Sequence, residues 1–214
     1  MSATRDVEVT AGPVELGGFL AVPAGARGIV IFAHGSGSSR HSPRNRRVAE
    51  HLLAGGLATL LIDLLTSEED ERDAVTREHR FDIPLLAERL AGATRWTAGR
   101  DETAGLLVGF FGASTGAAAS LVAAAREPDR VAAVVSRGGR PDLADDALPD
   151  VRAPTLLIVG GLDTEVIGMN RRAMARMSAE VELEIVEGAT HLFEEPGTLD
   201  RVADLARAWF LARL

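Results

Sequence analysis

A serine between two glycines is the first residue of this sequence whose type and surroundings could do chemistry. The segment Gly112-Ala-Ser114-Thr-Gly116 follows an apolar run and precedes an alanine-rich run. A G-x-S-x-G at a strand-to-helix turn is typical of a nucleophile elbow, which holds the serine side chain above the end of a sheet. The helix that follows points its N-terminal N–H groups at the serine, which favours a developing oxyanion. A serine at such a turn is also an ordinary helix N-cap, so the motif needs catalytic partners elsewhere.

A nucleophilic serine needs a base to take its proton, a carboxylate to orient that base, and N–H donors for the oxyanion. The sequence has no cysteine, tyrosine or lysine, so the available bases are its 5 histidines and the carboxylates. Asp163 and His191 follow Ser114 in the order Ser, Asp, His, and each comes after a predicted strand. Asp142 follows an earlier strand and is a competing choice for the acid.

The other polar residues that could take part in chemistry are better explained by structural roles. Asp63 ends a strand but precedes the serine, so we expect it to make structural hydrogen bonds. His34 is expected to shape a glycine-serine loop rather than to act as the base. No metal-ligand spacing, complete dinucleotide fingerprint or Walker lysine is present, so we expect no metal and no cofactor. The remaining histidines are expected at the surface: His41, His51 and His79.

Strands and helices must alternate along the chain if these residues are to meet. Residues 7–10 and 14–22 predict a hairpin, and residues 66–80 are so charged that they predict an exposed loop or a frayed helix. The other predicted strands are 28–33, 57–65, the run before Gly112, 130–135, 154–159 and 181–186. The predicted helices are 43–54, one capped by Asp82, one from the serine turn to about 126, one through Val166 and Met177, and one through Leu199 and Trp209.

This alternation predicts a parallel sheet with helices on both faces. Ligands of such sheets bind beyond the carboxyl ends of the strands. Each polar cluster of interest follows a strand in the sequence: His34–Arg40, Ser114, Asp142, Asp163 and His191. Structural polar residues would not be expected to sort in this way, so the sequence predicts one site at one edge of the sheet.

Composition limits the class of protein. The chain has 214 residues, of which 46% are hydrophobic and 25% charged, and this balance predicts one globular domain. The net charge of −8 argues against a nucleic-acid or anionic-membrane partner. The N-terminus lacks the apolar region of a signal peptide, and no apolar run is long enough to span a bilayer. We therefore expect a cytoplasmic protein, and the sequence leaves its oligomeric state open.

Taken together, the motifs resemble those of the α/β-hydrolases, and more closely the dienelactone-hydrolase-like branch of small members without a cap. The resemblance covers residues 28 to about 210. It implies a mostly parallel sheet of about seven or eight strands with helices on both faces and no large cap. It also implies a single domain over residues 1–214, with residues 1–27 as a hairpin on the sheet edge. The matching segments are His34–Ser39, Gly112–Gly116, Ser136–Leu143, Gly161–Asp163 and Gly188–Phe193.

The resemblance also implies roles. Ser114 is the implied nucleophile, His191 the general base and then acid, and Asp163 the acid that orients it. The implied oxyanion donors are the backbone N–H groups of Thr115 and Ser36. Dienelactone hydrolases proper use a cysteine nucleophile where this chain has serine, so the dienelactone substrate is not carried over.

The expected reaction is hydrolysis of small carboxylic esters through an acyl-enzyme, with the ester as the only expected partner. Thioesters, lactones and amides remain alternatives, as do acyl transfer and perhydrolysis, because the same triad serves all of them. A non-catalytic binding protein that kept the fold is an alternative of another class.

Four arginines follow predicted strands near the expected site: Arg40, Arg44, Arg137 and Arg140. One hypothesis is that Arg40 or Arg137 binds a carboxylate of the substrate. The alternative is that these side chains form salt bridges with neighbouring carboxylates.

Overall fold

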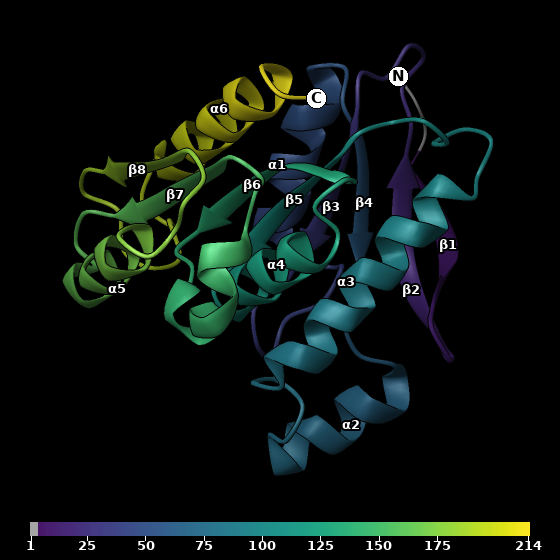
Figure 1. Cartoon of the computed structure of the whole chain (residues 1–214), viewed down its shortest axis with the longest axis horizontal. Helices are drawn as coiled ribbons and strands as arrows, with labels where there is room; N and C mark the ends of the chain where they lie inside the picture. Colours follow the sequence, from purple (N-terminus) through teal and green to yellow (C-terminus); the bar gives the residue numbers. More distant parts are fainter. Residues whose placement is uncertain (1–3) are drawn as a thin grey trace.

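The computed structural model of the chain describes residues 4–214, and it contains one eight-stranded sheet (Figure 1). The strand order is β1-β2-β4-β3-β5-β6-β7-β8. β1 and β2 form an antiparallel hairpin at one edge, β2 pairs antiparallel with β4, and every other pair is parallel. This is the predicted mostly parallel α/β-hydrolase sheet. The strands are β1 (Arg5–Ala11), β2 (Val14–Ala21), β3 (Ile29–Ala33), β4 (Ala58–Ile62), β5 (Val108–Ala113), β6 (Val131–Arg137), β7 (Thr155–Gly160) and β8 (Val181–Val186).

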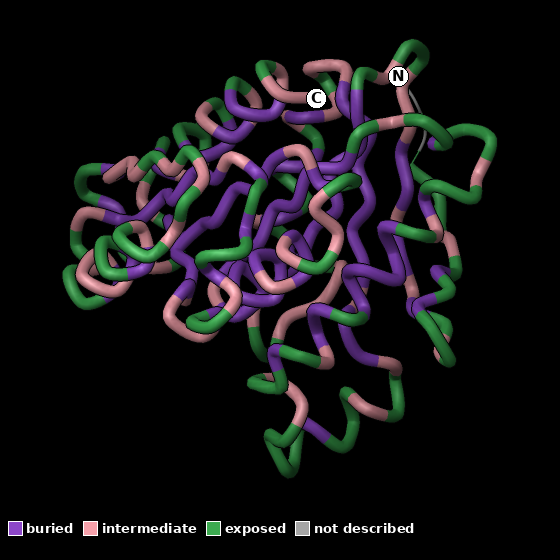
Figure 2. Tube along the Cα trace, in the orientation of Figure 1, coloured by how far each residue is buried: buried purple, intermediate pink, exposed green. Residues whose placement is uncertain are grey.

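The central strands are apolar throughout because helices cover both faces of the sheet. Every residue of β3, β4, β5 and β7 is buried (Figure 2). One face packs against α1 and α6, and the other against α3, α4 and α5. The helices are α1 (Pro43–Ala54), α2 (Ser67–Thr76), α3 (Ile83–Ala98), α4 (Thr115–Arg126), α5 (Thr164–Met174) and α6 (Thr198–Leu211), and a 3-10 helix, η1, spans Pro141–Asp150.

Helix starts follow the predicted caps, and the predicted ends of α1 at Ala54 and of α4 near Arg126 are confirmed, whereas that of α5 is not. Ser42 accepts a hydrogen bond from the Asn45 N–H, and Asp82 accepts one from the Leu85 N–H, as N-caps do. α5 ends at Met174, so the prediction that Met177 belongs to this helix is wrong. The 3-10 helix η1 was not predicted, because a short turn of this kind has no distinctive apolar period.

The charged segment 66–80 is an ordered helix, which corrects the expectation of an exposed loop or a frayed helix. Thr66 and Glu69 form a reciprocal capping box at the start of α2. The helix ends at Arg77, which adopts a left-handed conformation. In Figure 1, α2 lies beside the first turns of α3, away from the sheet, and in Figure 2 most of its length is exposed. It is a short flap and not a cap domain.

A buried carboxylate anchors this flap. The Asp73 side chain is 3% exposed and accepts the backbone N–H groups of His79 and Arg80 at 2.8 and 2.9 Å, and the Arg80 Nε at 2.7 Å. Burial acts to raise the pKa of Asp73, but the hydrogen bonds from Arg80 and His79 outweigh burial and lower it. The segment after α2 is therefore fixed by one ionised side chain.

We expect Asp73→Asn to weaken the flap by about 2–3 kcal/mol, because it leaves the Arg80 cation without its buried partner. Native-state hydrogen exchange of residues 66–81 measures the loss. The same helix provides the control Asp70→Asn, since Asp70 is exposed. Because the folded pKa of Asp73 is lowered, its stabilisation is complete above the unfolded value of ~3.9 and is lost as the pH falls below it. Equal exchange in the two variants would contradict this role.

None of the helices within residues 4–214 is both long and apolar enough to cross a membrane.

Candidate active site

Ser114 lies on a strained turn between β5 and α4. Its φ of 50° and ψ of −119° place a non-glycine residue at positive φ, a conformation that persists only where the surroundings enforce it. The flanking glycines are required by close approach: a Cβ on Gly112 would overlap Ala117, and one on Gly116 would overlap the carbonyl oxygens of Ala33 and His34. The G-x-S-x-G pattern is thus a packing requirement of this turn.

The Ser114 hydroxyl does not serve the helix it precedes. Ser114 occupies the N-cap position of α4, yet its side chain makes no capping hydrogen bond. It faces instead a cleft of about 260 Å³ that His191 also lines. The Ser114 side chain therefore does not act as a helix N-cap.

His191 is held by Asp163, across the ends of two neighbouring strands. The His191 Nδ1 lies 2.7 Å from Asp163 Oδ2. Asp163 follows β7, at the N-terminus of α5, and caps no helix N–H group. His191 follows β8, in a loop braced by Glu195, which accepts the Thr190 N–H at 3.1 Å and the Thr190 hydroxyl at 2.6 Å. This arrangement leaves the Nε2 atom of His191 as the one available for proton transfer.

The competing acid is engaged elsewhere. Asp142 accepts hydrogen bonds from Arg140 Nε at 2.9 and 3.2 Å and from Arg140 Nη2 at 2.7 Å. This side-chain hydrogen bonding is the main cause that lowers the pKa of Asp142. The structure therefore brings Asp163, and not Asp142, to His191.

The predicted oxyanion donors sit on either side of Ser114. Thr115 is the first residue of α4, so its N–H has no intrahelical acceptor. Ser36 lines the cleft, in a loop so close that a Cβ on Gly35 would lie 3.2 Å from the Ser114 Cβ. Within residues 4–214, no turn or loop hydrogen bond is donated by the backbone N–H of Ser36 or Thr115. These two N–H groups therefore remain the candidates for binding an oxyanion.

His34 holds the glycine-serine loop in place through two backbone hydrogen bonds. It is buried, its Nε2 accepts the Leu64 N–H at 3.0 Å, and its Nδ1 donates to the Gly35 carbonyl at 2.9 Å. These partners fix the neutral tautomer, because a backbone N–H can only donate and a carbonyl can only accept. Burial is the main cause that lowers the pKa of His34. His34 is a positioning residue here and not a base.

His34 should also make the protein less stable at mildly acidic pH. The unfolded state takes up a proton near pH 6.5 and the folded state only at lower pH, so stability falls as the pH drops below ~6.5, by at most about 1.4 kcal/mol per pH unit. We expect the melting temperature of the wild type to fall more steeply between pH 6.5 and 5 than that of His34→Gln. The exposed His41 gives the control His41→Gln. Parallel curves for the wild type and His34→Gln would exclude this effect.

The structure separates the two arginines proposed for substrate binding. Arg40 forms an ion pair with Asp63, which also accepts its backbone N–H at 2.7 Å. Both line a different cavity, so the structure does not bring Arg40 into the Ser114 cleft, and Asp63 makes the structural hydrogen bond and ion pair expected of it. Arg137 does line the Ser114 cleft. Which arginine meets a carboxylate depends on the order of the strands, which the sequence does not state.

Sequence reasoning missed part of the cleft wall. The residues it did not consider for the cleft are Ser42, the N-cap of α1, Asn45 in the first turn of that helix, and Leu192 in the loop after β8, whereas Arg44 was expected near the site. The available signal was Ser42-Pro43, which predicts a helix start directly after the glycine-serine loop.

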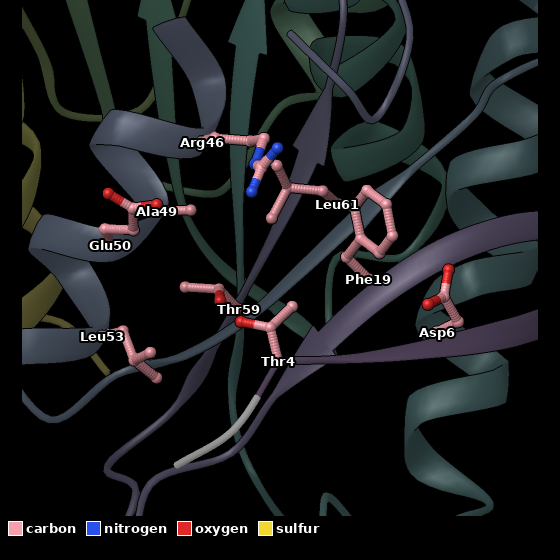
Figure 3. A pocket seen from close by; sticks show the side chains of 9 residues that line it. All are labelled: Thr4, Asp6, Phe19, Arg46, Ala49, Glu50, Leu53, Thr59 and Leu61. Carbon is pink, nitrogen blue, oxygen red and sulfur yellow. The ribbon is translucent and has the colours of Figure 1, made fainter. Parts of the chain in front are cut away.

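Two further observations limit where a ligand could bind. No group of three or more His, Cys, Asp or Glu side chains able to hold a metal is found in the described part of the chain. A cavity of about 240 Å³ lies between α1 and the sheet, where Arg46 and Glu50 face Phe19 and Leu61 (Figure 3). Neither Ser114, Asp163 nor His191 lines it.

Comparison with known proteins identifies relatives over nearly the whole chain. Two Mycobacterium tuberculosis proteins, whose names describe a phosphoribosyl transferase, are 60% identical over 210 residues. The matched region is 98% of this chain but only 46% of those proteins, so the chain spans about half the length of the curated relatives it matches.

Solved structures are similar over their full length. A dienelactone hydrolase from Anabaena variabilis is 60% identical, with a TM-score of 0.98 over 100% of this chain and 99% of that one. Est1E from Butyrivibrio proteoclasticus shares the fold, with a TM-score of 0.80 over 97% and 98% of the two chains at 15% identity. The model of the dienelactone hydrolase family matches residues 16–210. Because the family model matches most of the chain and a solved dienelactone hydrolase is 60% identical, this chain belongs to the dienelactone hydrolase family.

Proposed function

We propose that this hydrolase cleaves small carboxylic esters through an acyl-enzyme on Ser114. One observation carries the proposal: His191, hydrogen-bonded to Asp163 at 2.7 Å, lines the same cleft as a serine that is held at positive φ and caps nothing. A structural serine gains nothing from such strain, whereas a nucleophile gains exposure and alignment.

The reaction follows from the positions of these groups. His191 Nε2 takes the Ser114 proton while Oγ attacks the ester carbonyl, and the N–H groups of Thr115 and Ser36 bind the resulting oxyanion. His191 then protonates the departing alkoxide, which leaves the acyl group on Ser114. Water activated by the same imidazole releases the acid and restores the serine. Asp163 stays ionised throughout and stabilises the imidazolium.

The size of the cleft supports short substrates. Its volume of about 260 Å³ lies just below the range of drug-sized ligand pockets, roughly 300–1,000 Å³. No residue of the 10-residue helix α2 lines this cleft, so α2 does not extend it to hold a long acyl chain. Thioesters, lactones and amides pass through the same tetrahedral intermediate, and the triad alone does not discriminate among them.

A fluorophosphonate probe tests the nucleophile directly. We expect stoichiometric labelling at Ser114, together with hydrolysis of short p-nitrophenyl esters in preference to long ones. A protein that binds ligands without catalysis would show no labelling. Product analysis with a competing alcohol or hydrogen peroxide separates hydrolysis from acyl transfer and perhydrolysis, since ester or peracid would then accumulate in place of the free acid.

Phosphoribosyl transfer, named for the longer M. tuberculosis relatives, is not the activity that this site favours. The matched region is only 46% of those proteins, so each is more than twice as long as this region and more than half of it has no counterpart here. The groups gathered in the cleft supply a nucleophile, a base and oxyanion donors, which are the parts that acyl chemistry uses.

A further inference from the structure

One wall of the Ser114 cleft carries an enclosed positive charge. Arg137 is the last residue of β6, and its Cα pairs across the sheet with Ala113, next to the nucleophile. Its carbonyl accepts the Ser114 N–H at 3.3 Å. The residue is only 7% exposed and its side chain lines the cleft. A guanidinium therefore enters the site from a position adjacent to the reacting hydroxyl.

This guanidinium has no counterion. Within residues 4–214 its buried Nε lacks any acceptor and the side chain forms no salt bridge, and the guanidinium carbon lies 5.9 Å from the centroid of the Phe193 ring. Burial, and after it the charge of Arg44, lowers the pKa of Arg137 to about 10. The side chain is thus still a cation at neutral pH, and a buried cation without a partner is strongly unfavourable.

Other enclosed arginines of this fold are compensated. The Arg89 side chain, 6% exposed, pairs with Glu69 at 2.8 Å, and Arg80 pairs with Asp73 at 2.7 Å. Arg137 is thus an exception among the enclosed arginines of the described chain, and it is the one that lies in the cleft.

The neighbouring wall is also polar and incompletely satisfied. In the first turn of α1, Arg44 Nε and Asn45 Oδ1 are buried without partners among residues 4–214, and both residues line the cleft. Arg44 Nη1 pairs at 3.2 Å with Glu194, whose side chain is 64% exposed and so lies at the rim. The first turn of α1 contains no acidic residue, so its positive dipole end is not neutralised there. Two cations and a helix N-terminus converge on one small volume.

We propose that Arg137, assisted by Arg44, is the anion-binding residue of this cleft, so that the preferred ester carries a carboxylate or phosphate group close to its scissile carbonyl. The inference rests on the proposed function and adds the substrate class. The cleft of about 260 Å³ also contains Ser114 and His191, so the anion and the ester must belong to the same small molecule. An anionic group would supply the missing counterion and acceptor of Arg137.

Matched pairs of substrates test this. The carboxylate pair is mono-p-nitrophenyl succinate and its neutral methyl ester. The second pair is p-nitrophenyl 3-phosphonopropionate and its dimethyl phosphonate ester. The ratio of kcat/KM within each pair cancels any loss of folded enzyme. We expect the wild type to prefer the anionic member of at least one pair, and the pair with the larger ratio identifies the anion.

Substitutions then test whether Arg137 is responsible for the preference for the anionic substrate. Arg137→Met should lower the ratio at least about 30-fold, the effect expected when a buried charge loses its partner. Arg137→Lys, which keeps the charge but not the planar fork, should restore part of the ratio, and Arg44→Gln should lower it less than Arg137→Met. Arg47 lies on the same helix, exposed and paired with Asp200 at 2.7 Å, so Arg47→Gln should keep the wild-type ratio.

A binding measurement separates this inference from the proposed function. Succinate or 3-phosphonopropionate should raise the melting temperature of Ser114→Ala, and Arg137→Lys in that background should reduce the rise. A wild-type enzyme that hydrolyses esters but prefers neither anion overturns the inference and leaves the proposed function standing. So does an Arg137→Met ratio equal to that of the wild type. An anion-induced rise that depends on Arg137, in a protein that hydrolyses no ester, supports the subsite and refutes the proposed function.

Discussion

Replacing Ser114 with alanine is expected to lower kcat for a short p-nitrophenyl ester by about 10⁵–10⁶-fold and to abolish fluorophosphonate labelling. The reason is that the proposed acyl-enzyme forms on Ser114. The sequence has no cysteine or lysine, and the hydroxyl of Ser114 shares its cleft with the histidine that Asp163 holds. Steady-state kinetics on protein of verified folding measures the loss.

A matched serine variant supplies the control. Ser39 belongs to the same glycine-serine loop but lies outside the Ser114 cleft, where its hydroxyl accepts the His41 N–H at 3.2 Å. Ser39→Ala should therefore keep wild-type kcat. Retention of more than about a tenth of the activity by Ser114→Ala would refute the covalent mechanism, since a triad serine accounts for nearly all of kcat.

Asp163→Asn is the second large effect, with an expected loss of about 10⁴-fold in kcat. The amide is nearly isosteric, so the loss should come from chemistry and not from folding. Asparagine can donate its N–H₂ to His191 Nδ1, which places the imidazole proton on Nε2, where it cannot accept the Ser114 proton. The neutral amide also fails to stabilise the imidazolium that forms during attack. The kcat measured from pH 6 to 9 on a short ester shows the loss.

The competing carboxylate tests the specificity of this assignment. Asp142→Asn changes the same functional group at a residue that pairs with Arg140 at 2.7 Å instead of His191. We expect its kcat to remain within about threefold of the wild type, as for a partly exposed pair of small energetic value. If Asp142→Asn lost more activity than Asp163→Asn, the acid would have to be reassigned.

Two residues at the candidate site have strained backbone conformations. Ser114 and Phe193 are non-glycine residues at positive φ, of 50° and 55°, and each such residue costs about 1–3 kcal/mol. Ser114 lines the cleft, and Phe193 directly follows Leu192, which also lines it. Strain at both loops is consistent with a site in which alignment of the serine, the histidine and Arg137 is maintained against the local backbone preference.

The elements could be predicted because their patterns are local. Continuous apolar runs such as Ile29–Ala33 predict buried parallel strands, and Ser42-Pro43 predicts the start of α1 from capping chemistry alone. The ordered helix α2 was not predicted because it has no apolar face that a sequence pattern could reveal. It is stabilised instead by its capping box and by the hydrogen bonds of Asp73 to the chain after Arg77. In the sequence these residues are part of a highly charged segment, which is typical of a loop.

The family fold, the serine turn and the set of candidate partners could be predicted from the sequence, because each depends on residue type and spacing along the chain. The contacts that these side chains make could be found only in the folded chain. Asp142 and Asp163 both follow strands, but β7 and β8 are neighbours in the sheet, so Asp163 is the one that meets His191. Arg40 and Arg137 differ likewise: the pairing of β3 with β4 brings Asp63 to Arg40, while Arg137 is enclosed in the cleft without a carboxylate among the described residues. Such pairings depend on strand order, and strand order is set by packing across the whole sheet.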